Sequence, residues 1–204
     1  MKYIFSLFLY FLACVTFIMF GSILLLLFFI YPKSLYTMII LFCRLMITVF
    51  GCRIESNKRV PLNETYVIMA NHISFLDVFA IPAVFTGKFT AVSASKNFNI
   101  PVFATFLKKL KVISIDRSNR EQSIKGIKQA ESLIQSGYHV IILPEGTRSK
   151  DGNLGPFKKG GFHLAVNTKA RILPITTKGL YKIKPINRWT LIPGKITINV
   201  GEPI

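Results

Sequence analysis

The hydrophobic and polar positions divide this chain into two parts. Residues 3–32 carry no charged side chain, and a second apolar stretch follows at residues 34–54. About 20 consecutive apolar residues are enough to cross a bilayer, so the first stretch predicts a membrane helix. The apolar region of a cleavable signal peptide is only about 7–15 residues long and ends in small side chains. This run is longer and stays bulky to its end, which favours a retained anchor.

The second apolar stretch predicts another helix, joined to the first at residues 31–33. Arg44 lies in its middle, and an arginine at the centre of a lipid-exposed helix costs about 2.5–3.5 kcal/mol. We therefore expect this helix to lie partly at the membrane interface, with Arg44 reaching the headgroups. The pattern leaves open whether the anchor is a hairpin embedded from one side or a single span. The side that follows the first helix is favoured as cytoplasmic by a group of basic residues: Lys33, Arg44, Arg53, Lys58 and Arg59.

From residue 66 onward, short runs typical of strands alternate with helical patterns. The expected strands are 66–70, 90–94, 112–115, 139–143, 171–176 and 195–200, and the expected helices are 75–86, 101–110, 120–136 and 157–168. Ser118 and Glu121 form a capping box for the third helix, and Gly137 is placed to end it.

This alternation predicts an α/β fold with a mixed, largely parallel sheet flanked by helices. The expected division is a two-helix membrane anchor at residues 1–54 and an α/β domain at residues 55–204. Residues 55–64 are interpreted as a polar hinge between the two parts.

The charge balance points to an anionic partner. The chain has 26 basic and 9 acidic residues, for a net charge of +17. Nucleic acid, an anionic membrane surface and an anionic small substrate would each fit. The expected anchor favours the membrane surface, and no nucleic-acid-binding motif is present. All three cysteines, Cys14, Cys43 and Cys52, belong to the apolar part, which excludes a thiol nucleophile, a cysteine-rich zinc site and a disulfide framework in the remainder.

The segment Asn71–Asp77, NHISFLD, follows an expected strand and places histidine, serine and aspartate within one loop. Ser74 and Asp77 fit the signature of a helix N-terminus, with the serine as the cap. A capping serine is a poor nucleophile, and the G-x-S-x-G motif of hydrolases is absent. Asp77 could instead orient His72 through one ring nitrogen and leave the other free as a general base.

Two further loops carry an acid beside an arginine. One contains Asp116 and Arg117, and the other contains Glu145, Gly146, Thr147 and Arg148. The glycine allows close backbone approach to a ligand, and an arginine offers a two-pronged contact to phosphate. The alternative is a surface ion pair worth at most about 1 kcal/mol. Lys158 and Lys159, in a glycine-rich segment, are either a further anion-facing surface or a solvated helix end.

The order of these blocks, NH-x4-D, IDR, PEGTR and LPI (residues 173–175), resembles the glycerolipid acyltransferase family, specifically the bacterial 1-acylglycerol-3-phosphate acyltransferases. The resemblance covers roughly residues 66–204. It implies that His72 is the general base that deprotonates the acceptor hydroxyl and that Asp77 orients it. It further implies a glycerol-phosphate site at Arg117, Glu145, Gly146, Thr147 and Arg148, and an acyl-donor side at Pro174 and Lys96.

The resemblance also implies the reaction: transfer of a fatty acyl group from a thioester of coenzyme A or acyl carrier protein to the sn-2 hydroxyl of lysophosphatidate. A thioester is already activated, so no cofactor or metal is expected. The expected partners are anionic membrane lipids, lysophosphatidate and the acyl donor, without nucleic acid. The expected location is the bacterial inner membrane, with the catalytic domain on the cytoplasmic face. Two alternatives remain: another lysolipid acceptor, such as lyso-ornithine lipid, and a non-catalytic basic protein of the membrane surface.

Overall fold

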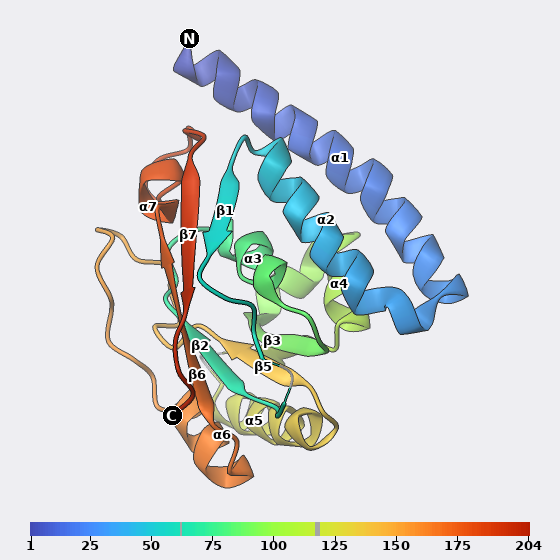
Figure 1. Cartoon of the computed structure of the whole chain (residues 1–204), viewed down its shortest axis with the longest axis vertical. Helices are drawn as coiled ribbons and strands as arrows, with labels where there is room; N and C mark the ends of the chain where they lie inside the picture. The colour runs from blue at the N-terminus through green and yellow to red at the C-terminus, as the bar shows by residue number, and fades with distance from the viewer. Residues whose placement is uncertain (62, 117–118) are drawn as a thin grey trace.

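The computed structural model describes residues 1–61, 63–116 and 119–204, with the side chains of residues 29, 32 and 120 excepted. Figure 1 shows a twisted sheet with helices on both faces and two N-terminal helices lying side by side across one of these faces. The chain starts at the free end of the long first helix and finishes close to the sheet.

The two apolar stretches form the two expected helices. Helix α1 spans Lys2–Ile30, a 3-10 turn η1 covers Pro32–Ser34, and α2 spans Leu35–Val49. Within the described chain, α1 is the one helix long and apolar enough to cross a membrane, judged by length and composition. Many of its large apolar side chains are exposed, including Phe8, Phe11 and Ile23. Such a surface is suited to lipid rather than to water.

Helix α2 packs against the α/β part of the chain. Ile39, Cys43 and Met46 are buried in a cluster that also contains sheet residues. The Arg44 Nε–H donates to the carbonyl of Ala83 at 2.9 Å. The expectation that Arg44 reaches the lipid headgroups is therefore wrong. Ala83 belongs to a short helical turn whose last carbonyls have no partner within the turn, and the guanidinium satisfies one of them.

Within the described residues, the sheet has seven strands in the order β1-β7-β6-β2-β5-β3-β4. Their bounds are β1 Arg53–Ser56, β2 Val67–Ala70, β3 Phe89–Ala94, β4 Ile113–Ile115, β5 His139–Ile142, β6 Ile172–Lys178 and β7 Lys195–Val200. Strands β2 to β6 are parallel to one another, whereas β7 runs antiparallel to β6 and β1 parallel to β7. The predicted α/β fold with a mixed, largely parallel sheet is confirmed.

Strand β1 was not expected from the sequence. Its residues 55–56 fall in the segment interpreted as a hinge, so the start of that segment is part of the sheet rather than a linker. The strand occupies the sheet edge and its residues are mostly exposed. Because an edge strand needs no apolar alternation, its polar sequence concealed it. The Asn57 side chain extends the pairing by hydrogen bonding both main-chain groups of Val200.

The remaining helices are α3 Asp77–Ala80, η2 Pro82–Val84, η3 Ser95–Asn99, α4 Phe103–Lys109, α5 Arg120–Gln135, α6 Gly160–Thr168 and α7 Leu180–Ile183. The helix expected at 75–86 is thus broken into α3 and η2 at Pro82, whose nitrogen carries no hydrogen to donate. The N-cap of α5 is Asn119, whose side chain accepts from Gln122 N at 3.0 Å. Ser118, the expected cap, lies outside the described residues. Gly137 ends the helix with φ of +82°, as predicted.

Two apolar clusters cover the two faces of the sheet. On one face, α1 to α4 pack over side chains such as Ile68 and Leu173. On the other face, α5 and α6 pack over Val67 and Val140. With both faces covered, the loops at the carboxyl ends of the five parallel strands are left open to ligands. In open α/β sheets this edge is where ligands bind.

Candidate active site

The loop after β2 holds the proposed base and its orienting acid in direct contact. His72 Nδ1 lies 2.7 Å from Asp77 Oδ2. An ionised carboxylate can only accept, so in a neutral ring this contact places the proton on Nδ1 and the free lone pair on Nε2. Asp77 is 2% exposed, whereas the His72 side chain is 22% exposed. The acid is therefore locked inside the fold and the base faces the edge of the sheet.

The backbone of the same loop holds Asp77 in place. Its Oδ2 also accepts from Ile73 N at 2.9 Å and from Ser74 N at 3.0 Å. Its Oδ1 is buried and has no hydrogen-bond partner among the described residues. Three donors thus converge on one carboxylate oxygen, which fixes the orientation of the imidazole through a turn of only six residues.

The Ser74 hydroxyl is bonded to the backbone of two segments and so supports the loop. Its Oγ donates to the Lys184 carbonyl at 2.8 Å and accepts from Leu76 N at 3.3 Å, and the residue is fully buried. The hydroxyl is engaged with the backbone, as the sequence indicated. Ser74 is not the N-cap, however, because α3 begins at Asp77 and Leu76 occupies that position. The helix starts later than expected because the Asp77 carboxylate draws the preceding amides toward itself.

Glu145 connects the His72 loop to a second loop. It follows β5, the neighbour of β2, and is 6% exposed. Its Oε1 accepts from His72 N at 2.7 Å and its Oε2 accepts from Gly155 N at 3.0 Å. A Cβ atom at Gly155 would lie 3.3 Å from Oε2, a tight contact, so a side chain here would press on the carboxylate. Both carboxylate oxygens are occupied by backbone donors, which makes Glu145 a positioning group.

The turn after Glu145 wraps around the backbone of His72. Gly146 has φ of +74° and donates its N–H to the Leu143 carbonyl at 2.9 Å, which closes a tight turn. Ser149 N then donates to the His72 carbonyl at 2.8 Å. Between these two anchored positions, Thr147 is exposed and Arg148 is half-buried. The turn therefore presents Arg148 beside the loop that carries His72 and Asp77.

A second cation that no motif indicated lies near Arg148 and contacts the same loop. Lys184, whose carbonyl binds Ser74, is half-buried just after α7. Burial, together with the nearby charges of Arg148 and Arg188, lowers the pKa of Lys184 below its usual value. Asn71 was also not anticipated: its side chain accepts from Thr177 N at 2.7 Å and donates to the Thr177 carbonyl at 3.0 Å, which ties the end of β2 to β6.

The other residues singled out by the sequence are spread along the same edge. Lys96 is exposed in η3 after β3, and Asp116 follows β4. Arg117 lies outside the described residues. Lys159 precedes the first residue of α6, and Lys158 N donates to the Pro144 carbonyl at 2.8 Å. Strand order places Lys96 and Asp116 farther from His72 than Glu145 is, since β5 separates β3 from β2.

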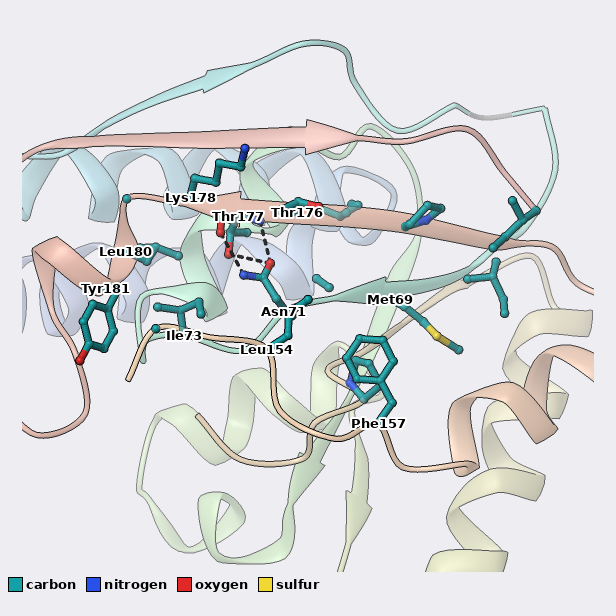
Figure 2. Close-up of a pocket in the computed structure, with 18 of the residues that line it drawn as sticks. Met69, Asn71, Ile73, Leu154, Phe157, Thr176, Thr177, Lys178, Leu180 and Tyr181 are labelled. Carbon is teal, nitrogen blue, oxygen red and sulfur yellow. Dashed lines mark hydrogen bonds between the residues drawn. The ribbon is translucent and has the colours of Figure 1, made fainter. Parts of the chain in front are cut away.

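A mainly apolar cavity of about 520 Å³ opens beside the loop that carries His72, with Asn71 and Ile73 in its lining. Figure 2 shows Leu154 and Phe157 on one side and Thr176 and Thr177 of β6 on the other, with Asn71 between them. Its lining also includes Pro174, but neither His72 nor Asp77. Among the described residues, no group of three or more histidine, cysteine or carboxylate side chains is arranged to hold a metal ion.

Comparisons with known proteins agree on one family. A family model described as Acyltransferase matches residues 51–178. The chain is 33% identical over 153 residues to the chloroplastic 1-acyl-sn-glycerol-3-phosphate acyltransferase BAT2 of Brassica napus, which covers 74% of this chain and 44% of the relative. It is 34% identical over 157 residues to the 1-acyl-sn-glycerol-3-phosphate acyltransferase of Pseudomonas aeruginosa, covering 75% and 60% respectively. The chain therefore spans roughly half the length of these curated relatives.

A solved structure extends the likeness to the whole chain. The crystal structure of the 1-acyl-sn-glycerophosphate (LPA) acyltransferase PlsC from Thermotoga maritima superposes with a TM-score of 0.87 at 26% sequence identity. It covers 100% of this chain and 87% of the other. The two N-terminal helices are thus included in the matched region.

Proposed function

We propose, on the basis that this chain belongs to the acyltransferase family, that it transfers a fatty acyl group from a thioester to the sn-2 hydroxyl of 1-acyl-sn-glycerol-3-phosphate. The observation that carries the proposal is the hydrogen bond between His72 Nδ1 and Asp77 Oδ2, which leaves Nε2 free at the open edge of the sheet. The relatives and the solved neighbour that share the fold are named for this activity.

The dyad can perform the reaction without an enzyme nucleophile. His72 Nε2 takes the proton of the acceptor hydroxyl as the oxygen attacks the thioester carbonyl. Asp77 stabilises the positive imidazolium that forms at that moment. The tetrahedral intermediate then expels the thiolate, which takes the proton from His72. The products are the ester and the free thiol, and the dyad returns to its starting state. The buried position of Ser74 Oγ supports this direct transfer over an acyl-serine intermediate.

The acceptor phosphate is assigned to the cationic side of the site. Arg148 presents a fork suited to phosphate, and Arg117 completes this site in the proposal. Glu145 and Gly146 contribute by holding the turn that presents Arg148, and Thr147 is exposed beside it. Glu145 is assigned the positioning role because its two oxygens accept from His72 N and Gly155 N, which are backbone groups of the two loops that it joins.

The acyl-donor side is assigned to the apolar cavity. Pro174 lines it together with Leu154 and Phe157, and Asn71 connects its lining to the adjacent His72. An acyl chain in this cavity would be removed from water at about 25 cal/mol per Å² of buried apolar surface. Lys96 is proposed to meet the anionic part of the donor, either coenzyme A or acyl carrier protein, from the neighbouring strand end.

The N-terminal helices are proposed to bring the site to its lipid substrate. Residues 1–54 would form the membrane anchor and residues 55–204 the catalytic domain. We place the protein in a bacterial inner membrane with the catalytic domain on the cytoplasmic face, where the basic chain meets anionic lipids. Each lysine or arginine near such a surface contributes about 1 kcal/mol of attraction.

The decisive experiment supplies the full-length protein in lipid nanodiscs with lysophosphatidate and either acyl-coenzyme A or acyl-acyl carrier protein. Mass spectrometry should detect phosphatidate with the new chain at the sn-2 position. His72→Ala should abolish its formation while retaining the fold. In cells, the wild-type chain should complement a temperature-sensitive lysophosphatidate acyltransferase strain and His72→Ala should not. Turnover of a phosphate-free acceptor alone would contradict the proposal.

A further inference from the structure

Two cations approach the catalytic loop from separate parts of the chain. Lys184 is held there by its carbonyl, which accepts from Ser74 Oγ at 2.8 Å. Arg148 is held there by its neighbour Ser149, whose N–H donates to the His72 carbonyl at 2.8 Å. The backbone of each cationic residue is therefore held at, or one residue from, a hydrogen bond to the loop. His72 and Ser74, the two attachment points, are two residues apart.

The segment that carries Lys184 is itself well anchored. Ile192 N donates to the Ile183 carbonyl at 3.0 Å, which closes the loop between α7 and β7. The Arg188 guanidinium donates to the carbonyls of Thr190, Lys182 and Ile183 at 3.1, 2.6 and 2.8 Å. Arg188 is thus occupied with the backbone and acts as a clamp on this loop. These hydrogen bonds set the backbone position of Lys184.

The charges at this place are unbalanced. In the part of the chain that the structure describes, Arg148, Lys184 and Arg188 form no ion pair. The two carboxylates of the neighbouring loops accept from other groups: Asp77 Oδ2 from His72 and two amides, and Glu145 from two amides. The Lys184 ammonium donates to the Pro185 carbonyl at 2.9 Å, which uses one of its three hydrogens. The half-buried cations therefore repel one another unless an anion joins them.

We infer that Lys184 binds the acceptor phosphate together with Arg148 and makes this site selective for phosphorylated lysolipids. A phosphate between the two side chains would satisfy the free donors of both and offset the repulsion among the three cations. It would also lie beside His72, as required if the same molecule carries the hydroxyl to be acylated. The inference rests on the proposed function and adds a phosphate ligand outside the sequence motifs. The lowered pKa of Lys184 is consistent with a charge that lacks its counter-ion.

The test distinguishes the contribution of the Lys184 ammonium from that of its backbone carbonyl. Lys184→Met keeps the carbonyl that binds Ser74 and much of the apolar stem, and it removes the ammonium. Lys182→Met is the matched control, because Lys182 is exposed at the end of the same helix and the change in net charge is identical. Lys184→Arg serves as the conservative variant. All are made in the full-length chain.

Two measurements are made on each variant. The first is equilibrium binding of radiolabelled lysophosphatidate in nonionic detergent without acyl donor. The second is steady-state kinetics with lysophosphatidate and with the phosphate-free 1-monoacylglycerol. For Lys184→Met we expect Kd and KM for lysophosphatidate to rise about 10- to 100-fold, the range of one lost charge-assisted hydrogen bond. We expect kcat to change less than about threefold. Lys184→Arg should recover most of the affinity, and Lys182→Met should match the wild type.

The outcomes distinguish the inference from the proposed function. Equal effects of Lys184→Met and Lys182→Met would overturn the inference, because they would show only a general charge effect. Equal losses on both acceptors would overturn it as well, since they would indicate a structural role. The wild type could bind lysophosphatidate but transfer no acyl group to it. If Lys184→Met then weakened that binding, the result would support the inference and contradict the proposed activity.

Discussion

Replacing Asp77 by asparagine separates the two tasks assigned to this carboxylate, orienting His72 and stabilising its positive charge. Ile73 N and Ser74 N both donate to the oxygen that also receives His72 Nδ1–H. These two amides should hold the asparagine oxygen at the same place, so the imidazole keeps its tautomer. The new NH2 group then occupies the buried site of Oδ1, where the described residues offer no partner. We expect the orientation to survive and the charge to be lost.

The expected loss of activity follows from the charge alone. Two unit charges about 4 Å apart interact by about 4 kcal/mol at an effective dielectric constant of 20. The side chain of His72 is 22% exposed, so solvent screening reduces this value, and about 2–4 kcal/mol is a reasonable range. In the proposed mechanism the imidazolium forms as the hydroxyl loses its proton, so the whole amount appears in the barrier. Turnover of Asp77→Asn should fall roughly 30- to 1000-fold. The unsatisfied NH2 group should reduce the free energy of unfolding by about 1–3 kcal/mol.

The assay measures kcat at saturating lysophosphatidate and acyl donor for the wild type, Asp77→Asn and His72→Ala. Thermal unfolding followed by circular dichroism establishes that each variant is folded at the assay temperature. A kcat for Asp77→Asn within threefold of the wild type would show that the charge is not used. A loss as complete as that of His72→Ala would show that the asparagine has turned and forced the wrong tautomer. Either result would refute the account of the dyad.

Three further predictions concern residues around the dyad. Glu145→Gln should lower kcat/KM about 10- to 100-fold, as measured in the same acyl-transfer assay, because one of the two backbone N–H groups would face an amide donor; unchanged activity would contradict the positioning role. Ser74→Ala should cost about 1–3 kcal/mol of stability in thermal unfolding and only a few-fold in activity, whereas inactivity of a folded variant would restore the serine as a nucleophile. Burial lowers the pKa of His139 to about 4 from its usual 6.5, so between these pH values the unfolded chain binds more protons and the free energy of unfolding should fall by about 3 kcal/mol as pH drops. His139→Gln should lack this component of the pH dependence in unfolding titrations.

Most of the sheet could be predicted because its buried strands leave a local pattern. Apolar runs bounded by turns located β2 to β7 to within a few residues. The pattern of apolar and polar residues gave wrong predictions where burial does not determine which residue types occur. Strand β1 is exposed at the sheet edge, so its last two residues were interpreted as part of a hinge. Arg44 read as a lipid-facing cation because the sequence does not reveal that the Ala83 carbonyl lies beside α2.

The candidate site likewise has one part that the sequence predicts and another that depends on the tertiary structure. The contact between His72 and Asp77 spans five residues, so one loop forms it and the sequence was sufficient to predict it. Glu145 was singled out by its motif, but its bond to His72 N spans 73 residues. That bond exists because β5 pairs with β2. The sequence therefore indicated which residues to expect in the site, but not which hydrogen bonds connect them.

By itself, the sequence determined the apolar helices, the alternation of strands and helices, and the contact between His72 and Asp77, because each depends on residues close together in the chain. Only the tertiary structure decided that Lys184 lies beside the loop that carries His72, through a hydrogen bond to Ser74 that spans 110 residues. Contacts of this kind depend on the order of strands in the sheet and on how the loops pack at its edge. No local pattern encodes that order, because it results from the packing of the whole chain.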